Sequence, residues 1–147
     1  MAQIISTDIS SLKLAAEVLG AGKLAALPTE TVYGLAADAT NGSAVAGIFS
    51  AKGRPHFNPL IAHVHDLAAA ERIARFNAVA RRLAEAFWPG PLPLVLPKTA
   101  DCAVASLATA GLDTVAVRMP SHPVAPDILP ELANPTLAPS AHRSGPV

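Results

Sequence analysis

Residues 51–64, AKGRPHFNPLIAHV, join the end of a predicted helix to the start of a predicted strand. The preceding residues 41–53, NGSAVAGIFSAKG, favour a helix that Asn41 or Ser43 can cap and that Gly53 ends. The apolar run PLIAHV at the end of the stretch is typical of a buried strand. A helix that leads through a glycine and proline turn into a buried strand is the repeating unit of a layered α/β domain.

The rest of the chain continues this alternation of helices and strands. Further helices are predicted at 8–21, 66–76 and 77–87, and further strands at 23–28, 92–97 and 113–119. Asp8 or Ser10, Asp66 and Asn77 are placed to cap the three helices. We therefore expect an α/β fold in a single domain, with proline confined to strand ends in the second half of the chain.

Length, charge and cysteine content narrow the class of protein. At 147 residues the chain can bury a core of its own. It has no apolar run near the ~18 residues of a membrane span and no basic region leading into an apolar leader. The single Cys102 suits a reducing cytoplasm. A formal net charge of zero argues against a strongly basic nucleic-acid-binding protein but leaves a local basic pocket open.

Lys52 and Arg54 form a cationic pair at the end of the predicted helix. A point charge and a planar fork together suit a polyphosphate. This is not a Walker A loop, in which the lysine follows its glycines and opens a helix. The alternative is that both side chains favour the negative end of the helix dipole and stay in solvent.

A row of hydroxyl groups precedes this pair. In residues 28–38, PTETVYGLAAD, the side chains of Thr29, Thr31 and Tyr33 alternate with their neighbours, so an extended backbone would place them on one face. Such a face can orient a small polar ligand. The same residues also favour an ordinary half-buried strand.

Histidine and arginine side chains lie in or next to two of the predicted strands. His63 and His65 share one side of a strand, but no further Cys or His lies near enough in sequence to complete a metal site. A neutral His63 that contacts a ligand is the favoured interpretation. Arg118 ends an apolar strand, where it can clamp a carboxylate or form a surface ion pair.

Together these segments resemble the YrdC-like threonylcarbamoyl-AMP synthases. PTETVYGL, AKGRPHFNPLIAHV, FWPGPL, DTVAVRMP and APSAHRSG occur in the order seen in that family, from about residue 10 to the C-terminus. The resemblance implies an open, twisted, mixed sheet flanked by helices around a concave basic cavity. It also implies a nucleotidyltransferase that forms threonylcarbamoyl-AMP and pyrophosphate from L-threonine, bicarbonate and ATP, for a transferase complex that modifies adenosine in tRNA.

The resemblance also implies roles for individual residues. Threonine would be held by Thr31, His63 and Arg118, with Thr29 and Tyr33 along the same wall. ATP would be held by Lys52, Arg54, Asn58, Thr114, Ser140 and His142, with Lys52 and Arg54 neutralising the phosphates during catalysis. Mg²⁺ would arrive with ATP on phosphate oxygens, so no metal-ligating residues are expected.

Three departures from the family pattern qualify these expectations. His142 replaces an asparagine, and Pro93 replaces a threonine. The family domain also continues for several tens of residues past APSAHRSG, so residues 1–147 are expected to lack its last part and to turn over little. The alternative function is a nucleotide- or RNA-binding protein with impaired catalysis. An exposed sheet edge could be covered by a homodimer.

Overall fold

The computed structural model describes residues 2–29, 32–55, 57–121, 128–132 and 134–143. Within these residues the helices are α1 (Ile9–Gly20), α2 (Gly42–Lys52), α3 (Leu67–Ile73) and α4 (Ala78–Phe87), with short 3-10 helices η1 (Ser106–Thr109) and η2 (Leu129–Glu131). The strands are β1 (Ala25–Leu27), β2 (Gly34–Asp38), β3 (Ile61–His63), β4 (Leu94–Pro97), β5 (Thr114–Arg118) and β6 (Thr136–Leu137). No helix of this described part is both long enough and apolar enough to cross a membrane.

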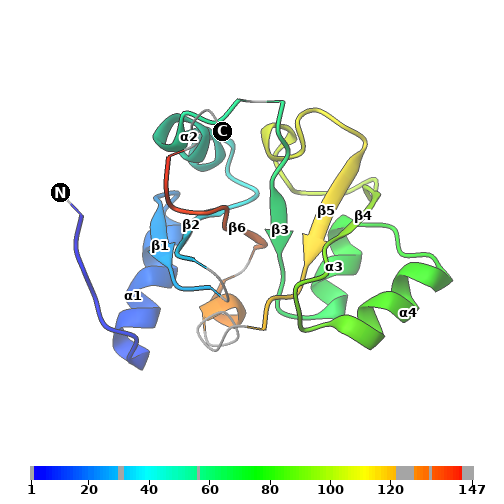
Figure 1. Ribbon diagram of the computed structural model, residues 1–147, viewed down its shortest axis with the longest axis horizontal. Coiled ribbons are helices and arrows are strands. Elements are labelled where there is room, and N and C mark those ends of the chain that lie inside the picture. The colour runs from blue at the N-terminus through cyan, green and yellow to red at the C-terminus, as the bar shows by residue number, and fades with distance from the viewer. Residues whose placement is uncertain (1, 30–31, 56, 122–127, 133, 144–147) are drawn as a thin grey trace.

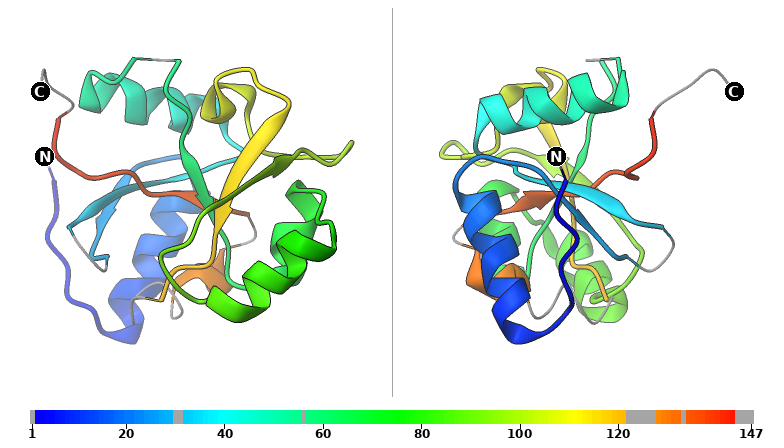
Figure 2. Two further views of the ribbon diagram at one scale, coloured as in Figure 1. Left: turned by 45° about the vertical axis from the view of Figure 1, so that its right-hand side comes forward. Right: turned by 90° about the vertical axis from the view of Figure 1, so that its left-hand side faces the viewer.

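All six of these strands belong to one open sheet. Their order is β1-β2-β6-β3-β5-β4, so β1 and β4 form its edges (Figure 1). Strands β3 and β5 run parallel, and every other neighbouring pair is antiparallel. The helices flank this sheet, as the further views in Figure 2 show. The predicted α/β class with an open mixed sheet is confirmed.

Each α-helix begins at a side-chain cap that the sequence indicates. The carboxylate or amide oxygens of Asp8, Asn41, Asp66 and Asn77 each accept a hydrogen bond from the backbone N–H three residues later, at 2.9, 3.1, 2.7 and 2.8 Å. Such caps satisfy N–H groups that the first helical turn leaves without partners. Gly53 ends α2 in the left-handed conformation, with φ of 62°.

The two faces of β4 and β5 have different environments. Leu94, Leu96, Val115 and Val117 are buried in the main core, which also contains the inward-facing residues of α3 and α4. The opposite face of β5 carries Thr114, Ala116 and Arg118, which are only half-buried. Because side chains alternate along a strand, one face of the sheet packs while the other stays open for a ligand.

Strands β2 and β6 were not predicted. Strand β2 has the sequence GLAAD, and alanine and glycine are poor strand formers, so no local signal marked it. Ala36 and Ala37 are nonetheless fully buried, because β2 is hydrogen-bonded between β1 and β6. Strand β6 has only two residues, too few for any periodic pattern to appear.

Candidate active site

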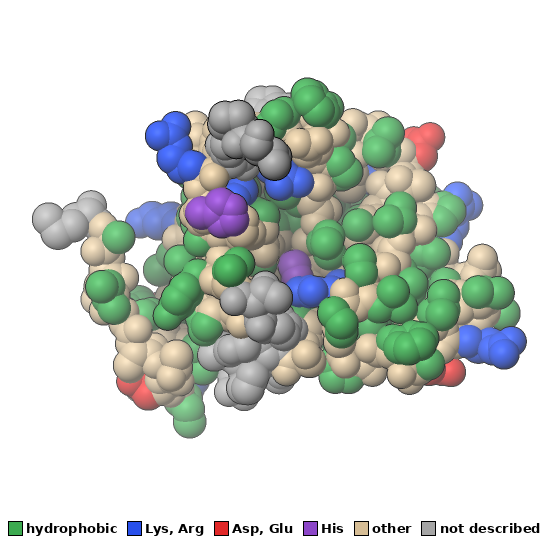
Figure 3. Space-filling view, in the orientation of Figure 1, with side chains coloured by type: hydrophobic (Ala, Val, Ile, Leu, Met, Phe, Trp, Pro, Cys, Tyr) green, Lys and Arg blue, Asp and Glu red, His purple; other side chains and the backbone are tan. Residues whose placement is uncertain are grey.

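A cavity of about 330 Å³ lies on the open side of the sheet. Its floor contains Ile61, His63 and Arg118, and the remaining lining residues are Thr29, Val32, Gly34, Arg54, Pro59, Leu60, Ala138, Pro139 and Ser140. Among the side chains coloured by type in Figure 3, lysine and arginine lie above and below this central hollow, and the acidic ones lie at the periphery of the view. The predicted concave, locally basic site is therefore present.

The parallel pairing of β3 and β5 brings His63 next to Arg118 in the floor. The two residues are register partners, and Arg118 Nη2 lies 3.1 Å from His63 Nε2. A guanidinium can only donate, so Nε2 accepts and the ring proton lies on Nδ1. Nδ1 is 3.3 Å from the carbonyl oxygen of Thr136, to which it can donate. His63 is therefore held as the neutral imidazole, and it orients the planar fork of Arg118.

Residues 138–142 form one wall of the cavity. The Leu35 N–H donates to the Pro139 carbonyl at 2.6 Å, and the Ala141 N–H donates to the Tyr33 carbonyl at 2.7 Å. These bonds continue the antiparallel pairing of β2 and β6 beyond the end of β6. Gly34 permits this close approach, since a Cβ there would lie 3.1 Å from the Ala138 carbonyl oxygen.

The two cations predicted to meet phosphate occupy different positions. Arg54 lines the cavity, and its Nη2 donates to the Pro59 carbonyl at 3.1 Å. Lys52 is only 2% exposed and is not among the lining residues. Its Nζ donates to the carbonyl oxygen of Ser140 at 2.6 Å and to that of His142 at 2.6 Å. Burial lowers the pKa of Lys52, and the charge of Arg54 lowers it further.

The other residues predicted to bind threonine are distributed unevenly around the cavity. Thr29 lines it, and its hydroxyl donates to the Val32 carbonyl. Tyr33 is 65% exposed and is not among the lining residues. Thr31 lies outside the described residues. The described residues on the Thr29 side of the cavity lie outside the strands, and β2 begins at Gly34.

Of the remaining residues predicted to bind ATP, one lines the cavity and the others are not among its lining residues. Ser140 is that lining residue. The carbonyl of Asn58 lies 3.4 Å from Arg54 Nε, and Thr114 shares the open face of β5 with Arg118. His142 is exposed, and its carbonyl is held by Lys52. Contact of any of these residues with a nucleotide stays a prediction.

Sequence reasoning missed the apolar part of the lining. Leu60 and Ile61 of the segment PLIAHV and Pro139 of APSAHRSG line the cavity but carry no chemistry that would single them out. Their only signal was their position inside motifs selected for other residues. Nothing local indicated that residue 52 would contact residues 140 and 142.

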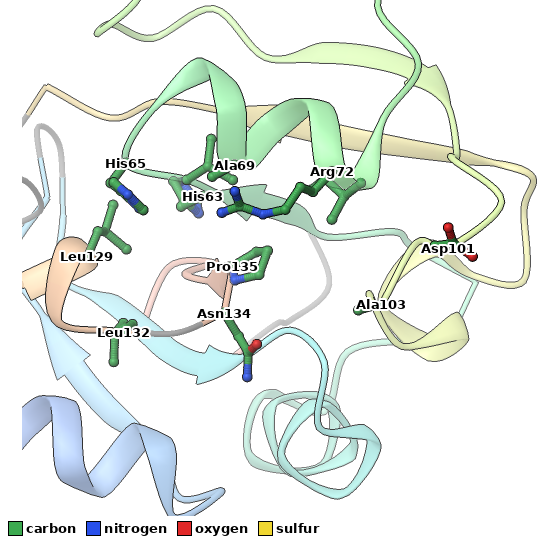
Figure 4. Close-up of a pocket in the computed structure, with 12 residues that line it drawn as sticks. His63, His65, Ala69, Arg72, Asp101, Ala103, Leu129, Leu132, Asn134 and Pro135 are labelled. Atoms are coloured by element: carbon green, nitrogen blue, oxygen red, sulfur yellow. The ribbon is translucent and has the colours of Figure 1, made fainter.

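A second cavity, of about 240 Å³, lies between α3 and the segment from η2 to β6 (Figure 4). His63 and His65 both border it, and Figure 4 shows Arg72 extending toward His63. His65 lies 3.3 Å from the carboxylate of Asp66. Within the described residues, no group of three or more His, Cys, Asp or Glu side chains is arranged to hold a metal ion.

The open mixed sheet with a basic cavity agrees with the family to which comparison with known proteins assigns this chain. The chain belongs to the Sua5, YciO and YrdC family, whose family model, described as Telomere recombination, matches residues 17–147. It is 38% identical over 136 residues to a threonylcarbamoyl-AMP synthase of Halorhodospira halophila, covering 88% of this chain and 68% of that protein.

More similar relatives are considerably longer. The threonylcarbamoyl-AMP synthase of Pyrococcus abyssi is 50% identical over 135 residues, covering 91% of this chain but 39% of that protein. The crystal structure of P. abyssi Sua5 complexed with L-threonine has a TM-score of 0.88 at 48% identity, covering 94% of this chain and 40% of that one. Escherichia coli YciO, at 23% identity and a TM-score of 0.78, shares the fold and covers 89% of this chain and 63% of that one. The prediction that residues 1–147 are one domain without its last part stays untested.

Proposed function

We propose that this chain forms the substrate-binding cavity of a threonylcarbamoyl-AMP synthase, a nucleotidyltransferase that makes threonylcarbamoyl-AMP and pyrophosphate from L-threonine, bicarbonate and ATP. The observation that carries this proposal is the convergence of Arg118 and Arg54, from separate segments, on one cavity. The names of the relatives and the L-threonine bound to P. abyssi Sua5 support it. The product would pass to a transferase that modifies tRNA in the cytoplasm.

The chemistry assigned to the cavity needs positioning and charge neutralisation, without a protein nucleophile. The fork of Arg118, oriented by neutral His63, takes the carboxylate of threonine in bidentate fashion. The free amine attacks bicarbonate, with loss of water, or carbon dioxide, with loss of a proton, to give a carbamate. A carbamate oxygen then bonds to the α-phosphorus of ATP as the bond to pyrophosphate breaks. Arg54 neutralises charge on the phosphates.

Side chains around this centre would complete substrate recognition. Thr29, Thr31 and Tyr33 would contact threonine from the side of the cavity that precedes β2. Asn58, Thr114, Ser140 and His142 would contact ATP. A homodimer that covers a sheet edge also stays a prediction, and either edge strand, β1 or β4, could take part.

Mg²⁺ would enter this site together with ATP. Among the described residues, the lining of the cavity includes no carboxylate. The hard oxygen ligands that Mg²⁺ prefers would therefore be phosphate oxygens and water. Bound in this way, the ion would neutralise charge on the phosphates.

Calorimetry and a pyrophosphate assay on the purified chain test the proposal. We expect L-threonine and Mg²⁺-ATP to bind, and pyrophosphate release to require threonine, bicarbonate and ATP together. Binding of both ligands without pyrophosphate release would favour the alternative of a nucleotide-binding protein with impaired catalysis. Binding of neither ligand would overturn the assignment of the cavity.

A further inference from the structure

Each N–H donor of the Lys52 ammonium has a hydrogen-bond acceptor inside the protein. Its Nζ lies 2.6 Å from the Ser140 carbonyl, 3.2 Å from the Ser140 hydroxyl and 2.6 Å from the His142 carbonyl. An ammonium has three N–H donors and no acceptor, so these three partners account for every donor. All three acceptors belong to a single segment, separated from Lys52 by 88 to 90 residues in sequence.

The backbone turn between Lys52 and Arg54 explains why the two cations diverge. Gly53 adopts the left-handed conformation, and the Arg54 N–H returns to the Phe49 carbonyl at 3.0 Å. Lys52 therefore remains the last residue of α2, buried behind the wall. Arg54 leaves the helix on the side of the cavity.

The wall that Lys52 contacts lies beyond the end of a regular strand. Strand β6 ends at Leu137, and among the described residues the bonds to Leu35 and Tyr33, which flank the bridge between Gly34 and Ser140, continue its pairing with the segment before β2. Short hydrogen bonds from a charged donor are about twice as strong as neutral ones. The ammonium is therefore a principal anchor of residues 139–142.

We propose that Lys52 is a positioning residue, whose ammonium holds residues 139–142 in place and so shapes the wall of the cavity, while Arg54 meets the phosphates directly. The part of this inference that concerns ligands rests on the proposed function. The part that concerns the wall does not, because it describes the chain without any ligand.

The two roles predict different patterns of ligand binding. Loss of a residue that contacts phosphate directly should weaken the binding of ATP and leave the affinities for adenosine and L-threonine unchanged. Loss of a residue that shapes the wall should weaken the binding of every ligand that contacts Pro139 or Ser140, whether or not that ligand carries phosphate. Arg54→Met should show the first pattern, and Lys52→Met should show the second.

Hydrogen exchange of the ligand-free chain, measured by NMR, tests the wall directly. Lys52→Met should speed exchange of the Ala141 and Leu35 amides roughly tenfold or more, because hydrogen bonds from a charged group are lost. Amides of α4 and β5 should keep their rates, which separates a local effect from general destabilisation. Arg54→Met, the matched control, should leave the wall unchanged. Unaltered wall exchange in Lys52→Met would overturn the proposal.

Two milder variants keep the test decisive if Lys52→Met does not fold. Ser140→Ala removes one acceptor and leaves both carbonyls, so it should speed wall exchange by less than about threefold. Lys52→Arg keeps the charge but spreads its donors over a planar fork, which cannot converge on the same three acceptors. It should speed wall exchange more than Ser140→Ala does. Wild-type exchange in Lys52→Arg would contradict the inference.

Discussion

The floor and the wall of the cavity reach their positions by different means. The floor, formed by β3 and β5, has three register pairs and rests on the main core through Val115 and Val117. The wall, residues 138–142, follows a two-residue strand and is fastened by the ammonium of Lys52. One cavity thus combines a side fixed by sheet pairing with a side fixed by a buried charge. The wall is the side that single substitutions should alter most readily.

The largest loss of stability should come from a substitution in β6, the strand between the floor and the wall. Leu137 is fully buried, and it pairs with Ala37 of β2 and Ala62 of β3. Leu137→Ala should lower the free energy of unfolding by about 2–5 kcal/mol, the usual cost of such a cavity. Urea denaturation measures this change.

Val79 offers a matched control, because it is 63% exposed on α4. Val79→Ala should change the free energy of unfolding by no more than about 0.5 kcal/mol. If Leu137→Ala and Val79→Ala lowered the free energy of unfolding by similar amounts, the role of β6 in joining the floor to the wall would be contradicted.

A smaller but more specific effect should separate the two arginines of the cavity. Arg118→Ala should weaken L-threonine binding by about 1.5–3 kcal/mol, as expected when a hydrogen-bonded charged group is lost. Arg54→Ala should weaken ATP binding by a similar amount and leave L-threonine largely unaffected. Calorimetry with each ligand on each variant measures these changes. If both substitutions weakened the two ligands equally, separate sites for carboxylate and phosphate would be excluded.

The smallest effect concerns how the free energy of unfolding depends on pH through Lys52. Burial and Arg54 lower the pKa of Lys52 from its ordinary value of 10.5. Between the lowered value and 10.5, the unfolded chain binds a proton that the folded chain has released, so the free energy of unfolding rises with pH. At lower pH both states keep the proton, and the full cost of burying the charge is present.

Lys52→Met lacks this titrating group. The stability of the wild type relative to Lys52→Met should therefore increase as pH rises toward 10.5, and urea denaturation of both proteins over that range measures the difference. A constant difference would mean that Lys52 has the same pKa in the folded and unfolded chains.

Local sequence determined much of the helical part of the fold. Asp66 and Asn77 were identified as caps because a capping side chain accepts from an N–H group two or three residues later, and both do so. Gly53 was identified as a helix end for a similarly local reason. His63 was selected because it shares one side of a predicted strand with His65, and Arg118 because it ends an apolar strand. The parallel register then placed the two side by side.

The sequence by itself determined the helices, most of the strands and the motifs that indicate the family. Only the tertiary structure decided that GLAAD is a strand, that a two-residue β6 lies between β2 and β3, and that Lys52 contacts the wall while Arg54 lines the cavity. Caps and turns depend on atoms a few residues apart, and sequence displays those neighbours directly. A short alanine strand or a buried ammonium is stable only with partners that folding brings from far along the chain. The separation of 88 positions between Lys52 and Ser140 therefore hid that contact from any local rule.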